Sequence, residues 1–194
     1  MHQAAGRGDL AIVQCLCEHI GPATVVSGEY VDNWTPLHQA ARWGNSDAVV
    51  RYLLEIGFDR RIDAVTEYGY TPLLYAAEMG RLSVVQCLCA WGADKEARDD
   101  SGYTALHRAA RFDHLAVVQR LCEHWEVDCT ATNEYRMTAL HVAAFEGSVA
   151  VVRYMCQSGK FDLSARCEED YTPLETAKFA KRSTVLDYLL ERGV

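Results

Sequence analysis

A tetrapeptide that begins with threonine recurs along this chain at a nearly constant interval. Successive threonines are 36, 33, 34 and 34 residues apart. A period of this length indicates a repeat protein, in which no single repeat can bury its apolar face and neighbouring repeats must stack. The copies are Thr35-Pro36-Leu37-His38, Thr71-Pro72-Leu73-Leu74, Thr104-Ala105-Leu106-His107, Thr138-Ala139-Leu140-His141 and Thr172-Pro173-Leu174-Glu175.

Each copy has the features of a helix start. Threonine can serve as an N-cap, because its hydroxyl accepts a backbone N–H of the first turn, and proline fits the first helical position. Thr172 and Glu175 have the spacing of a capping box. The residues that follow, such as Leu140, Ala143 and Ala144, form an apolar stripe on one helix face. We expect these first helices at 36–43, 72–79, 105–112, 139–146 and 173–180.

A second helix should follow in each repeat. In one copy its apolar face reads Val84, Val85, Leu88 and Cys89, which is a wide stripe at helical spacing. We expect second helices at 47–55, 82–90, 115–123, 149–157 and 183–191.

The first helices should end at residues suited to the left-handed conformation. Glycine favours this conformation at a helix end, and it occurs here as Gly8, Gly44, Gly80 and Gly147. Asp113 and Lys181 take the same place in the other two repeats. Aspartate adopts the left-handed region tolerably, whereas Lys181 leaves the geometry of its turn open.

The tetrapeptides and their period resemble those of the ankyrin-repeat family. The resemblance implies an all-α solenoid of stacked helix-turn-helix units, with a β-hairpin finger in the polar stretch before each cap threonine. Because it covers the whole chain, we expect a single ankyrin-repeat domain over 1–194. The approximate repeats are 1–28, 29–64, 65–97, 98–131, 132–165 and 166–194. The first and last are incomplete, so we expect a piece of a longer protein or a short protein with abbreviated end repeats.

Charge and motifs exclude several functions. The net charge of −8 disfavours nucleic-acid binding, which needs a basic surface. No stretch is long and apolar enough to insert into a membrane, and the sequence contains no phosphate-binding loop, zinc-protease signature or nucleophile elbow. Histidines at the signature position suit structural hydrogen bonds, because no acid stands at a matched position beside each: His2, His38, His107 and His141. We expect a non-enzymatic protein without a cofactor.

The eight cysteines are predicted to be core residues. Cys15 and Cys17 are two residues apart on a helix, as are Cys87 and Cys89, so neither pair can direct both thiols at one metal ion. One core position is shared with leucines of other repeats by Cys17, Cys89, Cys122 and Cys156. Cysteine at such a position is a small apolar residue. Free core thiols suit a reducing compartment, the cytoplasm or the nucleus.

Residues that differ between repeats are the informative ones for function. In ankyrin-repeat proteins the partner is usually gripped by the finger tips and by the exposed face of the first helix. At two such positions this chain is aromatic or methionine in five repeats, with Trp34, Tyr70, Tyr103, Met137 and Tyr171 before the cap, and Trp43, Met79, Phe112, Phe145 and Phe179 near the helix end. Exposed apolar patches mark interaction sites, and Trp and Tyr dominate binding hot spots.

The sequence therefore predicts a monomeric module that binds a protein or peptide in a concave aromatic and acidic groove. Acidic residues such as Glu67 and Glu134 outnumber bases there, which favours a partner segment with Lys or Arg. The predicted binding residues are Trp34, Trp43, Tyr68, Tyr70, Glu78, Met79, Tyr103, Arg111, Phe112, Met137 and Phe145, centred on Trp34, Trp43, Tyr70, Met79, Tyr103 and Phe112.

Three alternatives stay open. The first is a reader of methylated lysine, in which an aromatic cage is formed by Trp34, Trp43, Tyr70 and Glu78. The second is a regulatory or scaffold domain of a larger enzyme. In the third, the rings pack on neighbouring fingers and only stiffen the stack.

Overall fold

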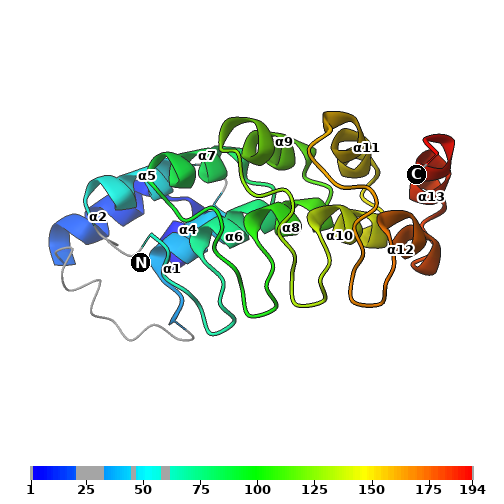
Figure 1. The fold of residues 1–194 in the computed structure, drawn as a ribbon. Coiled ribbons are helices and arrows are strands. Elements are labelled where there is room, and N and C mark those ends of the chain that lie inside the picture. The colour runs from blue at the N-terminus through cyan, green and yellow to red at the C-terminus, as the bar shows by residue number, and fades with distance from the viewer. Residues whose placement is uncertain (1, 21–32, 45–46, 58–61, 194) are drawn as a thin grey trace. The chain divides into compact units, whose positions relative to one another are not determined.

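The computed structural model describes residues 2–20, 33–44, 47–57 and 62–193 (Figure 1). The chain divides into two compact units, Met1–Asp100 and Ser101–Val194. No helix among the described residues is long and apolar enough to cross a membrane. The repeat boundary predicted between 28 and 29, and the side chain of His2, lie outside the described residues.

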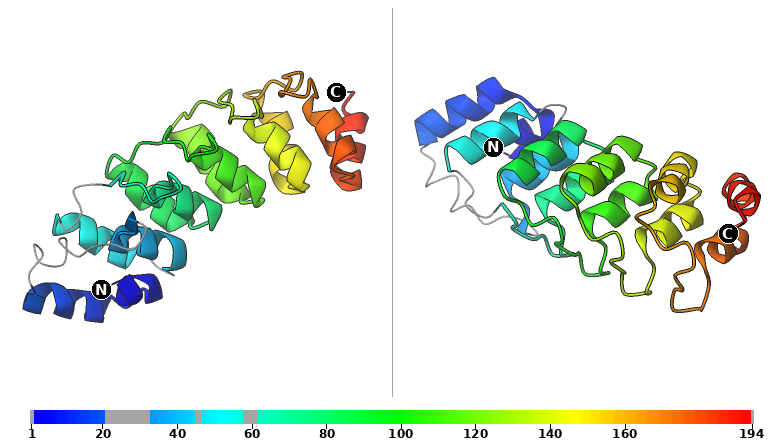
Figure 2. Two further views of the ribbon diagram at one scale, coloured as in Figure 1. Left: turned by 90° about the horizontal axis from the view of Figure 1, so that it is seen from below. Right: turned by 45° about the horizontal axis from the view of Figure 1, so that its top comes forward.

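Unit 1 consists of paired helices in two layers. Its first helices α1, α4 and α6 pack against one another in one layer, and the second helices α2, α5 and α7 form the other (Figures 1 and 2). Their bounds are α1 His2–Arg7, α2 Leu10–Ile20, α4 Pro36–Trp43, α5 Ala48–Glu55, α6 Pro72–Glu78 and α7 Leu82–Ala90. The predicted apolar stripe of α7 faces the core, with Val84, Val85 and Leu88 fully buried.

Unit 2 repeats the same arrangement. Helices α8, α10 and α12 form one layer, and α9, α11 and α13 form the other. Their bounds are α8 Ala105–Arg111, α9 Leu115–His124, α10 Ala139–Glu146, α11 Val149–Ser158, α12 Pro173–Phe179 and α13 Ser183–Glu191. Every helix predicted from the sequence is present within one residue of its expected ends. The predicted all-α repeat fold is therefore confirmed.

Cap threonines begin the first helices as predicted. Thr35, Thr71 and Thr138 have extended backbones, and each hydroxyl accepts a hydrogen bond from the backbone N–H three residues later. The capping box of Thr172 and Glu175 is confirmed, because Thr172 N–H donates to Glu175 Oε2 at 2.8 Å. In return, the backbone N–H of Glu175 donates to Thr172 Oγ1 at 3.3 Å.

Signature histidines close the same box and also join consecutive repeats. Thr35 N–H donates to Nδ1 of His38 at 3.1 Å, so the ring proton lies on Nε2, which donates to the Tyr70 carbonyl at 2.9 Å. His107 and His141 make the equivalent bond to a carbonyl of the following repeat, at 3.1 and 3.0 Å. All three rings are completely buried. Their role is therefore structural, as the sequence predicted.

The ends of the first helices follow the prediction except at Gly44. Left-handed backbone occurs at Gly8, Gly80, Gly147, Asp113 and Lys181, with φ of 71°, 65°, 86°, 58° and 57°. The prediction for Gly44 is wrong, because its φ of −63° and ψ of 134° are extended. The connection to α5 is one residue longer in this repeat than the connection from α6 to α7. Glycine is still required, because a Cβ would lie 2.3 Å from the Ala40 carbonyl oxygen.

The fingers are tight hairpin turns rather than extended β-ladders. Among the described residues, bridge pairing is limited to an isolated antiparallel contact between Thr132 and Thr138. In three of the turns a backbone hydrogen bond joins the two arms, namely Thr66 N–H to Tyr70 O, Asn133 N–H to Met137 O, and Cys167 N–H to Tyr171 O, at 3.0, 3.0 and 3.1 Å. In unit 2, the turns before α10 and α12 project to the same side of the first-helix layer (Figure 2).

Candidate functional site

In unit 1, the predicted residues Trp34, Tyr70 and Glu78 gather around a ring that the sequence analysis did not select. This ring belongs to Tyr75 of α6, which is 4% exposed. Its centroid lies 4.5 Å from that of Tyr70 and 4.7 Å from that of Trp34. The Tyr70 hydroxyl donates to Glu78 Oε2 at 2.9 Å. These side chains therefore form one packed cluster that includes the predicted carboxylate of Glu78.

The guanidinium of Arg42 covers this cluster. Its central carbon lies 4.8 Å from the ring centroid of Trp43, 5.1 Å from that of Tyr75 and 5.4 Å from that of Trp34. Arginine stacked on ring faces gains cation–π attraction and shields the rings from water. Trp43 nevertheless remains 53% exposed at the end of α4. The aromatic cage that the sequence predicts is thus filled by the chain's own cation.

In unit 2, arginines also lie on the predicted rings. Arg108, buried in α8, places its guanidinium 4.6 Å from the ring centroid of Tyr103. Arg111 lies 5.5 Å from the ring centroid of Phe112, and its Nε donates to Glu146 Oε1 at 3.0 Å. The Phe112 ring keeps 47% of its surface exposed. Arg111 and Glu146 therefore neutralise each other across α8 and α10.

The hairpin turns carry the most exposed predicted ring. Tyr68 is 65% exposed, and Tyr135 holds the corresponding place in unit 2 with 50% exposed. A glutamate precedes each of them, Glu67 and Glu134, and both glutamates are exposed. Backbone bonds order the turns within each unit, from Asp100 N–H to Tyr68 O at 3.3 Å and from Glu168 N–H to Tyr135 O at 3.0 Å.

Burial separates the predicted residues into two groups. The expectation that all central rings are exposed is wrong for Trp34, Tyr70 and Tyr103, which are half-buried against their neighbours. Met79 and Met137 are half-buried as well, while Phe145 is exposed. For the half-buried rings, the alternative that they stiffen the stack therefore accounts for part of their role.

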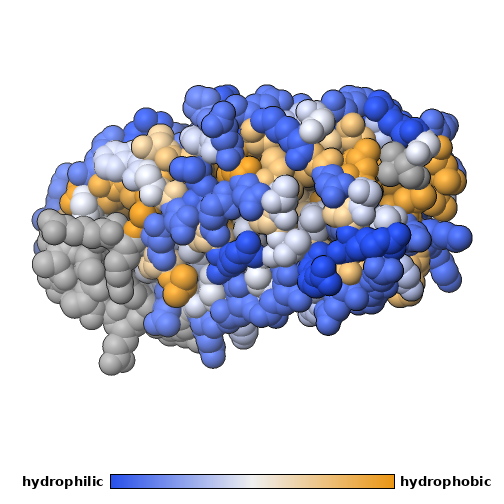
Figure 3. Space-filling view, viewed as in Figure 1, coloured by the Kyte–Doolittle hydropathy of each residue, from blue (hydrophilic) through white to orange (hydrophobic). Residues whose placement is uncertain are grey.

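One face of the molecule is chemically mixed. On the face seen in Figure 3, hydrophilic residues prevail, and the hydrophobic ones lie between them in small groups. A partner on such a surface would meet groups of apolar side chains within a polar frame. Interfaces of this composition are common among associations that are not permanent.

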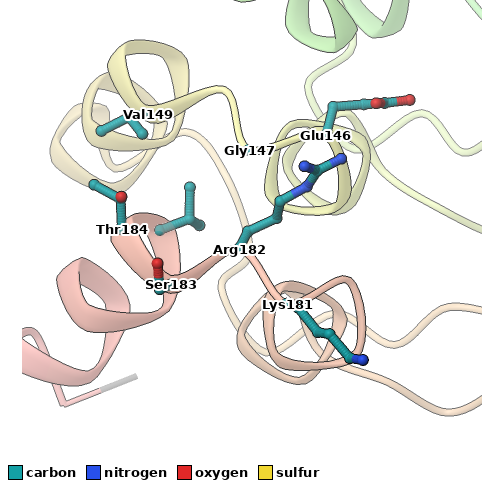
Figure 4. A pocket seen from close by; sticks show the side chains of 8 residues that line it. Glu146, Gly147, Val149, Lys181, Arg182, Ser183 and Thr184 are labelled. Carbon is teal, nitrogen blue, oxygen red and sulfur yellow. The ribbon is translucent and has the colours of Figure 1, made fainter.

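A shallow pocket of about 260 Å³ lies beside the last repeat of unit 2. Its wall combines the end of α10 with the starts of α11 and α13 (Figure 4). Arg182 extends across it toward Glu146 and Gly147, and its Nε donates to the Phe145 carbonyl at 2.8 Å. Because Arg182 already holds the last repeat in place through this bond, we interpret the pocket as a space left by the packing of the repeats.

The cysteines behave as core residues in most positions. Cys17, Cys89 and Cys122 are buried, as predicted, whereas Cys156 is half-buried. Burial raises the pKa of the Cys89 thiol to about 12. All eight cysteines are in the thiol form, and among the described residues no group of three or more His, Cys, Asp or Glu is arranged to hold a metal ion.

Comparison with protein families agrees with the repeat geometry. Residues 1–99 match a family model described as ankyrin repeats (3 copies), and residues 106–156 match a model described as ankyrin repeats (many copies). The chain belongs to the ankyrin-repeat family. Ankyrin repeats generally mediate protein–protein interaction, and ankyrin-repeat domains are typically non-catalytic.

Two curated relatives each contain a stretch that is similar to part of this chain. The chain is 32% identical over 101 residues to ankyrin repeat protein nuc-2 of Neurospora crassa. It is 35% identical over 101 residues to the transient receptor potential cation channel subfamily A member 1 homolog of Caenorhabditis elegans. Each match covers 52% of this chain, but only 9% and 8% of the two relatives. The similarity therefore extends to a small part of each relative.

The sequence did not indicate two residues that contact the predicted rings. Tyr75 and Arg108 occupy the same repeat position, which holds Gln39 in repeat 2 and Val142 in repeat 5. The mixed chemistry of that position suggests solvent exposure, yet Tyr75 and Arg108 are both buried. Each of them contacts the ring that stands just before the cap threonine of its own repeat, five residues earlier, and this pairing was a usable signal.

Proposed function

We propose that this ankyrin-repeat chain binds a protein segment bearing Lys or Arg, and that the hairpin turns make the principal contacts. The observation that carries the proposal is an exposed tyrosine beside an exposed glutamate, present as Glu67-Tyr68 in unit 1 and as Glu134-Tyr135 in unit 2. A tyrosine face attracts a cation, and a neighbouring carboxylate pairs with it. The backbone bonds that order the turns reduce the conformational entropy lost on binding.

The first helices contribute packing and apolar contact area to this surface, but not carboxylates that could pair with a cationic partner. Glu78 already accepts a hydrogen bond from Tyr70, and Glu146 is paired with Arg111. Carboxylates for a cationic partner therefore come from the turns. Exposed rings at the ends of first helices, Trp43 and Phe112, add apolar contact area.

The geometry of unit 1 disfavours a reader of methylated lysine. A bound methylammonium group would have to displace Arg42, whose guanidinium lies over both tryptophan rings of the predicted cage. Arginine stacks well on aromatic faces and always keeps its charge. We therefore favour recognition of an ordinary protein segment.

The eight cysteines, all in the thiol form, support a reducing cytoplasmic or nuclear compartment.

The proposal is tested by capture of partners from a cell extract on immobilised protein, with quantification of each captured protein. The variant Tyr68→Ala/Tyr135→Ala should lose the specific partners. Trp91→Ala is the matched control, because Trp91 is 47% exposed but lies after the second helix α7. If the control loses the same partners, or if the double variant retains them, the turns are not the binding surface.

The charge preference needs a separate measurement. Peptides tiled from a captured partner identify its bound segment, and the affinity of this peptide is then measured for the wild type and for Glu67→Gln/Glu134→Gln. We expect weaker binding by the variant and a smaller loss of affinity when salt is raised, because fewer ion pairs remain to be screened. Equal affinity and equal salt dependence would contradict the Lys/Arg preference while leaving the turn surface intact.

A further inference from the structure

The loop that follows α9 folds back onto the end of that helix and brings two thiols together. Cys122 lies in the last turns of α9, and Cys129 lies in the connection to the next hairpin turn. The backbone reverses at Glu126, whose φ is +49°, and Val127 N–H donates to the Leu121 carbonyl at 3.4 Å. The Sγ atoms of Cys122 and Cys129 lie 3.7 Å apart, in hydrogen-bond contact.

This thiol pair is held in place by its surroundings on both sides. Val127 is buried and anchors the loop between the two cysteines. On the helix side, the Lys160 side chain donates a hydrogen bond from Nζ to the carbonyl of Cys122. The two thiols therefore meet through an ordered backbone rather than through chance rotation of exposed side chains.

We propose that Cys122 and Cys129 form a reversible intramolecular disulfide when the protein meets a hydroperoxide. A disulfide requires the sulfur atoms to approach to about 2.05 Å. The two sulfur atoms are 3.7 Å apart and must therefore move closer together. Small side-chain rotations and a shift of the loop that carries the half-exposed Cys129 can supply this movement. Neither the ankyrin-repeat fold nor the proposed binding surface requires this chemistry.

The exposure of the two thiols sets the order of the steps. Cys122 is 1% exposed, whereas Cys129 is half-exposed, so the hydroperoxide meets Cys129 first. The Cys129 sulfur attacks the outer peroxide oxygen, the O–O bond breaks, and Cys129 becomes a sulfenic acid. The Cys129 thiol proton passes to the departing oxygen, which leaves as an alcohol, or as water when the oxidant is hydrogen peroxide. Cys122 Sγ then attacks Cys129 Sγ, so the S–S bond forms, the S–O bond breaks, and the hydroxide leaves as water with the Cys122 proton. Two electrons pass from the thiol pair to the peroxide.

The resting pair should react slowly. The hydrogen-bond contact with Cys129 and burial both raise the pKa of Cys122 far above its ordinary value. Because the thiolate is the reactive form, Cys122 stays a thiol until Cys129 has been oxidised. A slow, paired site of this kind responds to sustained oxidant rather than to brief exposure.

The sequence makes a direct chemical test possible. Glu123 and Glu126 lie between the two cysteines, so a protease that cleaves after glutamate separates Cys122 from Cys129. The reduced full chain is treated with hydrogen peroxide under native conditions, remaining thiols are alkylated, and the digest is analysed by mass spectrometry. The expected product is the two cysteine-bearing fragments joined by a disulfide, with the loss of two hydrogen atoms, and dithiothreitol should restore both free thiols.

Three comparisons decide the outcome. Cys129→Ser should abolish the joined fragments and leave Cys122 reduced, whereas Cys156→Ser, which removes another half-buried thiol, should leave them unchanged. Oxidation of the exposed Cys15 in the same sample demonstrates that the peroxide was active. The proposal is overturned if Cys15 is oxidised while Cys122 and Cys129 remain unlinked, or if the link forms only after the protein has been unfolded in urea.

Discussion

Replacing Tyr75 by alanine should destabilise the protein far more than replacing the neighbouring, larger Trp43. Tyr75 is 4% exposed, and its ring stacks on Tyr70 at 4.5 Å and on Trp34 at 4.7 Å. Truncation of a buried aromatic side chain to alanine costs about 3–5 kcal/mol, because apolar burial is lost and a cavity remains. We expect Tyr75→Ala to lower the free energy of unfolding by an amount in this range.

Trp43 belongs to the same cluster but contributes through a different contact. Its ring is 53% exposed, and the Arg42 guanidinium lies 4.8 Å from its centroid. An exposed cation–π contact is worth about 0.5–1 kcal/mol. Trp43→Ala should therefore lower the free energy of unfolding by no more than about 1 kcal/mol. Tyr75→Phe is the matched control, because it keeps the ring and removes only the hydroxyl that bonds Thr66 and Arg42, at a cost of about 1 kcal/mol.

The assay is urea unfolding followed by circular dichroism at the helix band. Repeat arrays can unfold in steps, so the comparison is valid only where the slope of free energy against urea is the same for each variant. Equal losses for Tyr75→Ala and Trp43→Ala would refute the assignment of Tyr75 as the packed centre of the cluster. A loss below about 1 kcal/mol for Tyr75→Ala would do so as well.

Three other outcomes are expected. Burial lowers the pKa of His141 below its ordinary 6.5, so the unfolded chain binds the proton more readily than the folded chain. Stability in urea should therefore fall as the pH drops from 7.5 through 6.5, and greater stability in acid would contradict this. Chelators and reductants should leave the melting temperature of the reduced protein unchanged, and a stoichiometric metal ion would show the cysteine argument to be wrong. Trp43→Ala and Phe112→Ala should each weaken partner binding by about 2 kcal/mol, measured by calorimetry, and normal affinity in both would exclude the helix ends from the interface.

The fold could be predicted almost completely because its determinants are local. A threonine cap followed by an apolar stripe specifies a helix start within a few residues, and five copies at a nearly constant period place the first helices α4, α6, α8, α10 and α12. The failure at Gly44 has the same origin. Its extended backbone follows from a connection that is one residue longer, which a rule drawn from the shorter copies does not anticipate.

The candidate site could be predicted only in part because its contacts join different repeats. The sequence indicates which residues stand at the positions that ankyrin-repeat proteins use, and Trp43, Tyr68 and Phe112 are exposed there. It does not indicate that His38 donates to the Tyr70 carbonyl, 32 residues away, because a backbone acceptor has no sequence signature. The exposure of each ring likewise depends on what the next repeat places against it.

Arginine is the residue type whose role in the structure differs most from the role that the sequence suggests. In the sequence, Arg42 and Arg111 are two of the few basic residues at positions where acidic residues predominate. In the structure, each guanidinium lies over a ring of its own unit, and Arg111 also neutralises Glu146. A cation held in this way fixes the orientation of the rings beneath it, and a preordered ring loses less entropy when a partner binds. The arginines therefore stiffen the first-helix layer, while the acidic turn residues Glu67 and Glu134 are left to set the charge that a partner meets.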